Sequence, residues 1–114
     1  MSHEEEFQEA KLSLKEEIKD TLRDIEEHRK ELEIILSVSD KFGDDPSKME
    51  FIKAVTKDAI DDAKSTIAHF EKLIKSAKLL KNKPLYVTVR YTWEHQKKIL
   101  ESGSSKAKSK VRLT

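Results

Sequence analysis

Two long stretches of the chain repeat apolar residues at three- and four-residue steps, and no other feature restricts the fold as strongly. This spacing places apolar side chains on one face of a helix, which turns once in ~3.6 residues. The first stretch runs from about residue 7 to 38, and the second from about residue 49 to 77. Both are therefore predicted to be amphipathic helices, whose apolar faces include Phe7, Ala10, Leu14, Ile18, Leu22, Ile25, Leu32, Ile35 and Leu36, then Met49, Ile52, Val55, Ala59, Ala63, Ile67, Phe70, Ile74 and Ala77.

The segment between the two stretches carries the signals of a helix–helix turn. Gly43 suits a left-handed residue that closes a helix, Asp45 suits an N-cap, and Pro46 suits a first helical position. Each flanking helix would have roughly 36 residues and a length of about 54 Å, at ~1.5 Å per residue. The sequence therefore predicts a long antiparallel helical hairpin with its turn at residues 39–46.

Residues 84–101 are compatible with two structures. Apolar and polar side chains alternate from Leu85 to Trp93, which is typical of a strand. A lone strand, however, would leave its backbone groups without partners in this chain, and Leu85, Val89 and Trp93 also fit one helical face. We therefore expect a third, shorter helix that ends near Gly103.

The last 13 residues differ in composition from the rest. Residues 102–114 contain four Ser and four Lys or Arg, with no acidic residue and little to bury. We therefore expect a helical domain at residues 1–101 and a disordered basic tail at residues 102–114. The predicted fold class is all-α, a three-helix bundle built on a long antiparallel hairpin with a shorter third helix.

Composition also bears on location. The sequence has no apolar run of the ~20 residues that cross a bilayer, and residues 1–6 are acidic where a signal peptide would be basic. It has no Cys, so disulfides are excluded and a reducing compartment is permitted. We expect a cytoplasmic protein without a membrane span.

Charge is divided unevenly along the chain. Residues 1–50 carry 8 Lys or Arg against 16 Asp or Glu, whereas residues 51–114 carry 15 against 6. The lysines of the basic half have two interpretations, a solvated helix face or a surface that binds phosphates of a nucleic acid. The candidate anion-binding residues are Lys72, Lys75, Lys78, Lys81, Lys83, Lys97 and Lys98.

Arg90 and His95 are separated by four residues, and this spacing resembles the R-x4-H motif of HEPN-type ribonucleases. The resemblance covers residues 90–95 and implies an RNA-cleaving dimer of helical bundles in which Arg90 and His95 act together. Tyr91 stands where these enzymes usually have a polar residue.

Other chemical motifs are missing from the sequence. No two His have the four-residue spacing of a helical metal site, and there is no Gly-rich phosphate loop or nucleophile motif. We therefore expect no metal, no cofactor, no small-molecule substrate and no enzymatic activity.

The hairpin end near residues 39–46 is the more apolar end. A third helix of about 18 residues would span roughly 27 Å and leave this end uncovered. Uncovered apolar surface usually marks an interface. The sequence therefore predicts a non-catalytic protein-interaction or assembly module, as a homodimer or with a partner helix, through Ile34, Ile35, Val38, Phe42, Phe51 and Val55.

Overall fold

The computed structural model describes residues 3–81 and 83–113, and this part of the chain forms three helices without a strand. Helix α1 spans His3–Phe42, α2 spans Pro46–Leu79 and α3 spans Lys83–Lys110. The prediction of an all-α three-helix bundle is confirmed. The alternating segment that begins at Leu85 is helical, and its Thr88 and Thr92 hydroxyls donate hydrogen bonds to carbonyls four residues earlier.

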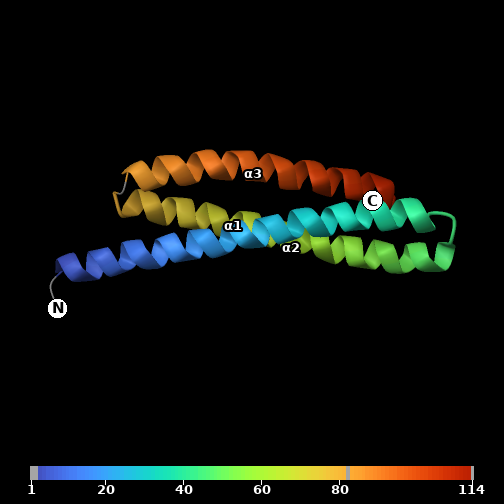
Figure 1. Ribbon diagram of the computed structural model, residues 1–114, viewed down its shortest axis with the longest axis horizontal. Coiled ribbons are helices and arrows are strands. Elements are labelled where there is room, and N and C mark those ends of the chain that lie inside the picture. Colours follow the sequence, from blue (N-terminus) through green and yellow to red (C-terminus); the bar gives the residue numbers. More distant parts are fainter. Residues whose placement is uncertain (1–2, 82, 114) are drawn as a thin grey trace.

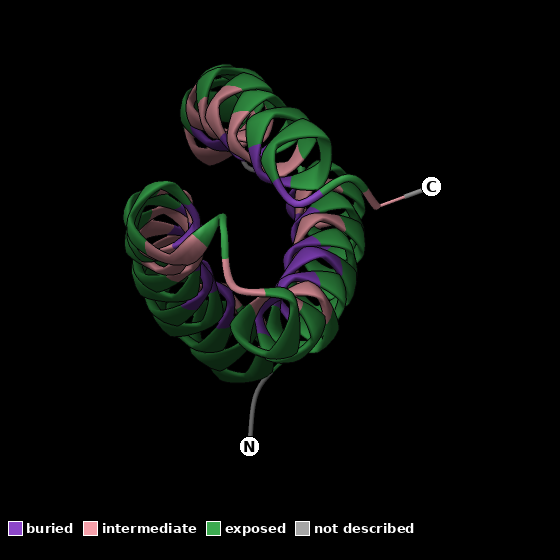
Figure 2. Ribbon diagram, turned by 90° about the vertical axis from the view of Figure 1, so that its right-hand side faces the viewer, coloured by how far each residue is buried: buried purple, intermediate pink, exposed green. Residues whose placement is uncertain are grey.

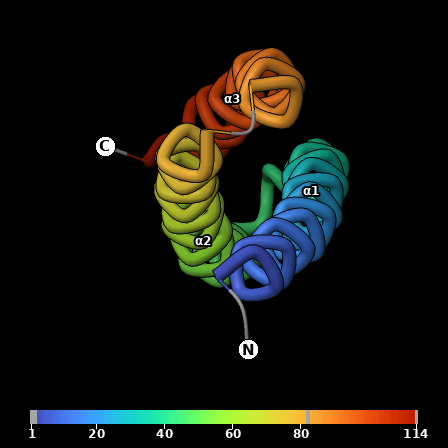
Figure 3. Tube along the Cα trace, turned by 90° about the vertical axis from the view of Figure 1, so that its left-hand side faces the viewer, coloured from blue at the N-terminus to red at the C-terminus, as the bar shows by residue number. Residues whose placement is uncertain are grey.

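The three helices lie side by side in an elongated molecule of 63 × 24 × 20 Å. In Figure 1, α1 and α2 run in opposite directions, and α3 returns along them. Contacts agree with this direction, because Glu17 of α1 meets His69 of α2, whereas His28 meets Thr66 nearer the turn. Viewed along the long axis, α2 lies between the near ends of α1 and α3 (Figure 3), and farther along, α3 also contacts α1, where Gly103 lies against Leu32.

The turn between α1 and α2 differs from its prediction at Gly43. Helix α1 continues to Phe42, whose ring packs against the core, and no glycine of the described chain has a positive φ. Gly43 instead avoids a tight contact, since a Cβ there would lie 3.0 Å from the Ser39 carbonyl oxygen. The predicted start of α2 is confirmed, because the Asp45 side chain accepts hydrogen bonds from two backbone N–H groups and Pro46 follows it.

The core is a single apolar cluster that extends along all three helices. Figure 2 shows the buried residues on the sides of the helices that face one another, with exposed residues on the outside. The largest side chains in full burial are Phe70, Ile25, Leu32, Leu100 and Val111. Because these come from every helix, no helix has a core of its own.

Residues 102–113 are the clearest departure from the sequence prediction. Instead of ending near Gly103, α3 continues to Lys110, and Ala107 and Val111 are fully buried. The expected boundary at residue 101 therefore falls inside a helix, and the disordered basic tail is replaced by packed structure.

Small side chains explain why this part of α3 packs. A Cβ at Gly103 would lie 3.3 Å from the Leu32 Cδ1 atom, so the glycine lets α3 approach α1 closely. The helix closes at Arg112, which has a φ of 58°. Backbone hydrogen bonds from Arg112 to Ser109 and from Leu113 to Lys108 form the Schellman pattern that normally uses glycine.

The longer α3 changes the expected exposure of the hairpin. With 28 residues it spans roughly 42 Å, and an ion pair joins Lys110 to Asp40 near the end of α1. The prediction that α3 covers only the half of the hairpin far from its turn is therefore wrong. Apolar residues near the turn are therefore not all exposed, and their burial differs from one residue to the next.

Candidate functional site

The six residues predicted as a protein interface divide into two groups. Ile35 is buried, and Val38 and Phe42 are half-buried against the core cluster. The other three are exposed large apolar residues: Ile34 at 62%, Phe51 at 72% and Val55 at 36%. The predicted interface is thus reduced to these three.

Helix geometry places the exposed residues on one face of the α1–α2 pair. On α1, Leu32 and Leu36 line the side next to α3, and Ile34 is two residues from each, about 200° around the helix. On α2, Ile60 lines the side next to α3, and Phe51 is about 180° from it. Both therefore point away from α3.

Ile34 and Val55 also lie at the same level of the hairpin. Ile34 comes eight residues before the end of α1 at Phe42, and Val55 comes nine residues after Pro46. Val55 is one helical turn from Phe51 and shares its side of α2. We call Ile34, Phe51 and Val55 the seam patch.

The predicted anion-binding lysines are not equivalent. Lys97 contacts Glu71 and Glu101, and its ammonium lies 4.6 Å from the Trp93 ring centroid, so it is already partnered. Within residues 3–81 and 83–113, no ion pair involves the remaining six, which are all exposed: Lys72, Lys75, Lys78, Lys81, Lys83 and Lys98.

Three of these lysines surround an apolar depression where α2 connects to α3. Its volume is about 380 Å³, and its lining is Ala77, Lys78, Lys81, Lys83, Tyr86 and Val87. Leu79 and Tyr91 add apolar surface to this end of the molecule, since they are 81% and 78% exposed. We call this lining, with Leu79 and Tyr91, the basic end. The lysines of the basic end were predicted from the sequence, but its apolar residues were not, because they belong to otherwise amphipathic helices.

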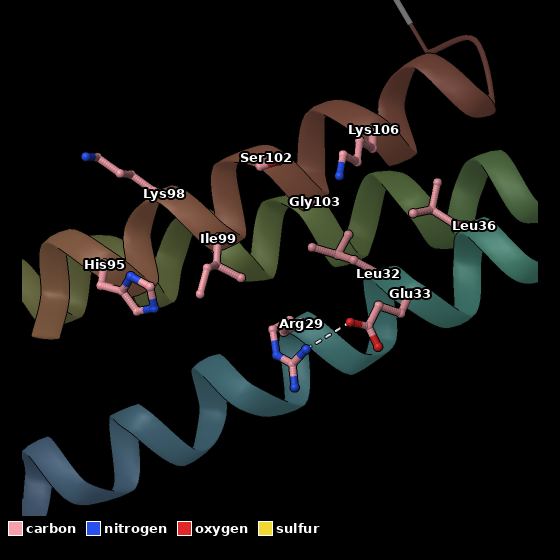
Figure 4. Close-up of a pocket in the computed structure, with 10 residues that line it drawn as sticks. All are labelled: Arg29, Leu32, Glu33, Leu36, His95, Lys98, Ile99, Ser102, Gly103 and Lys106. Carbon is pink, nitrogen blue, oxygen red and sulfur yellow. Dashed lines mark hydrogen bonds and ion pairs between the residues drawn. The ribbon is translucent and has the colours of Figure 1, made fainter.

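A second depression, of about 510 Å³, lies between α1 and α3. Figure 4 shows its two walls, with Arg29 and Glu33 on α1 and His95, Lys98 and Lys106 on α3. Leu32, Leu36 and Ile99 form its apolar part. Sequence analysis missed this groove, because it exists only where two distant helices meet.

Arg29 in this groove is held by carboxylates of its own helix. Its guanidinium donates to Glu26, at 3.1 Å from Nε to Oε2, and to Glu33 at 2.9 Å. The hydrogen bond with Arg29 lowers the pKa of Glu26 below its ordinary value, and the same bond raises the pKa of Arg29. Arg29 is therefore engaged in a local network on α1.

The residues of the ribonuclease resemblance lie on different sides of α3. Arg90 donates to Glu94 at 3.3 Å, and this hydrogen bond raises the pKa of Arg90. His95 lines the groove between α1 and α3. Five residues correspond to about 140° around a helix, so the two side chains point in different directions.

The histidines form no cluster. His28 is half-buried between α1 and α2, where its Nε2 atom is 2.9 Å from the Thr66 hydroxyl. His69 contacts Glu17 at 3.4 Å and so faces α1 rather than His95. Among the residues that the structure describes, no group of three or more His, Cys, Asp or Glu could hold a metal ion.

The chain matches no family model, and no curated protein or solved structure gives a significant match. None of the helices, over the described ranges, combines the length and apolar character needed to cross a membrane.

Proposed function

We propose that the protein is a non-catalytic helical interaction or assembly module, and that the seam patch on the α1–α2 pair is its contact surface. The observation that supports this is the exposure of Ile34 and Phe51 on one face of two packed helices. An apolar strip across a helix pair accepts the apolar face of another helix, from a partner or from a second copy.

The size of the apolar side chains supports an association of moderate strength. Burial of a side chain such as Ile34 or Phe51 contributes ~1.5–3 kcal/mol. Association also costs translational and rotational freedom, so a few such residues with their neighbours correspond to roughly micromolar affinity. The seam patch therefore supports a reversible contact.

The test replaces both residues at the centre of the patch. In the Ile34→Lys/Phe51→Lys double variant, two charges occupy the patch, and self-association should be lost without loss of helix. Solution mass from light scattering, at about 0.05 M and about 0.5 M salt, measures this. Apolar association should survive the higher salt, because screening acts on charges.

Leu12→Lys is a matched control, because Leu12 is 63% exposed on α1 and lies far along the helix from the seam patch. It should leave the salt-resistant association unchanged. A wild-type protein that stays monomeric at high salt and high concentration would contradict self-association through the seam patch. Unfolding of the double variant would show that Ile34 and Phe51 are structural.

Nucleic-acid binding is the second candidate, and it is favoured by the six exposed lysines that form no ion pair with another described residue. Phosphate contacts release counterions, so affinity for a single-stranded RNA should fall steeply as salt rises. Exposed Tyr91 could stack on a base. Titration of a labelled RNA at the same two salt concentrations distinguishes this candidate from apolar association, and recovery of intact RNA would argue against the ribonuclease interpretation.

A further inference from the structure

The N-terminal part of α1 projects beyond the other two helices. Figure 1 shows α1 extending past the connection between α2 and α3. Because Gly103 lies against Leu32, the start of α3 at Lys83 is level with about Leu12. Residues 3–11, ~13 Å of helix, therefore project past α3, whereas the Glu17–His69 contact makes the end of α2 at Leu79 level with about Phe7.

This projection is acidic and carries apolar side chains. It contains Glu4, Glu5, Glu6 and Glu9 against one lysine, Lys11. Phe7 is half-buried, with the Lys11 ammonium 4.4 Å from its ring centroid, and the exposed Leu12 follows at the base of the projection. We call residues 3–12 the acidic arm.

The acidic arm and the basic end belong to the same end of the molecule, yet Glu4, Glu6 and Glu9 form no ion pair with the lysines of the basic end among the described residues. Glu6 contacts His3, and Glu4 accepts a hydrogen bond from Gln8. Over the described residues, the charges of Glu4, Glu6 and Glu9 are therefore not matched by the lysines of the basic end.

We propose that a second copy of this chain docks at this end, with the acidic arm of each copy lying on the basic end of the other. A two-fold axis permits this, because both surfaces lie at one end and each contact then occurs twice. Glu6 and Glu9, which lie about one turn apart on one side of the arm, face Lys78, Lys81 and Lys83. Leu12 lies on the same side of α1 as Glu9 and meets the exposed apolar residues of the basic end.

The length of the arm limits the size of the interface and therefore the strength of the pairing. An arm of ~13 Å covers about nine residues of helix, so it reaches only the last turns of α2 and the first turns of α3 of the other copy. Two such contacts make a small interface with charged edges. Pairing through it is therefore reversible and weakens as salt rises, unlike association through the seam patch, on which it does not depend.

Charge reversal on each surface tests the pairing. One variant carries Glu6→Lys and Glu9→Lys, and the other carries Lys78→Glu and Lys83→Glu; Lys81 is left unchanged because its φ is 54°. Each variant alone brings like charges together and should pair ~10-fold more weakly or not at all. An equimolar mixture of the two should form a heterodimer, since each arm then meets a basic end of opposite sign. Sedimentation velocity at low salt measures all three samples.

The outcomes separate this pairing from its alternatives. The far-UV circular dichroism of each variant is the control for folding. If the Glu6→Lys/Glu9→Lys variant loses helix, the pairing is judged from the mass of the Lys78→Glu/Lys83→Glu variant alone. Salt-sensitive mass in the wild type, lost in each variant and restored in the mixture, supports the pairing. A wild type that stays monomeric at low salt overturns it, as does a monomer that binds a mixed-sequence single-stranded RNA through Lys78 and Lys83. The Ile34→Lys/Phe51→Lys variant should keep the salt-sensitive association. The contact through the seam patch and the contact through the acidic arm are therefore tested independently of each other.

Discussion

Gly103 and Ala107 are the residues with the smallest side chains where the C-terminal part of α3 packs on the rest of the molecule. Gly103 faces Leu32, and Ala107 is fully buried one turn later. Residues this small do not add to the apolar periodicity by which a buried helix face is recognised in a sequence. They contribute instead by leaving space for another helix to approach. Their role depends on Leu32, more than 70 residues earlier in the sequence.

Substitution of Gly103 by a large side chain should therefore destabilise the fold. Gly103→Leu places a side chain where a Cβ already lies 3.3 Å from Leu32, and we expect the free energy of unfolding to fall by ~1–3 kcal/mol. Ser105→Leu is the matched control, since Ser105 is exposed on the same helix and should change by less than ~0.5 kcal/mol. Urea unfolding of both variants measures the difference, and equal stabilities would contradict the close packing.

At the level of elements, α1 and α2 follow from their own sequence, whereas α3 does not. The apolar faces of α1 and α2 and the Asp45 cap are local signals, and the structure contains both helices. The C-terminal part of α3 has a polar composition and is held by the burial of Ala107 and Val111 and by the ion pair between Lys110 and Asp40. Its helical state depends on contact with the other helices.

Removal of residues 102–114 tests this dependence. A disordered tail would leave stability unchanged, but loss of these residues uncovers Leu32 and removes the buried Val111. We expect the free energy of unfolding to fall by ~3 kcal/mol or more. Hydrogen exchange of the full chain gives a second measure, because the backbone amides of residues 103–110 should exchange as slowly as those in the middle of α1 and α2. Fast exchange of these amides, together with an unchanged free energy of unfolding after the deletion, would support a disordered tail instead.

The whole molecule is long and thin for its number of residues. Its radius of gyration is 17.9 Å, against about 13 Å for a compact domain of this length. One apolar cluster nevertheless runs along it and includes residues from all three helices. A helix that separates from the other two would expose part of this cluster, so the three helices should unfold together.

We therefore expect one cooperative unfolding transition. Far-UV circular dichroism follows all helices, while fluorescence of Trp93, the only tryptophan, follows the contact of α3 with the core. The two signals should give the same midpoint in urea. An earlier Trp93 transition would mean that α3 separates from a stable α1–α2 pair.

The sequence by itself determined the helical class, the turn at Asp45 and Pro46, and the separation of acidic and basic halves, because each depends on neighbours within a few residues. Tertiary structure decided where α3 ends, and that Ile35 and Phe42 are covered whereas Ile34 and Phe51 are not. It also decided that Lys97 is partnered, while Lys78 has no ion pair within the part of the chain that the structure describes. Burial and pairing are properties of two surfaces together. Whether a side chain is covered depends on a helix that is distant in the sequence, and no local pattern contains that information.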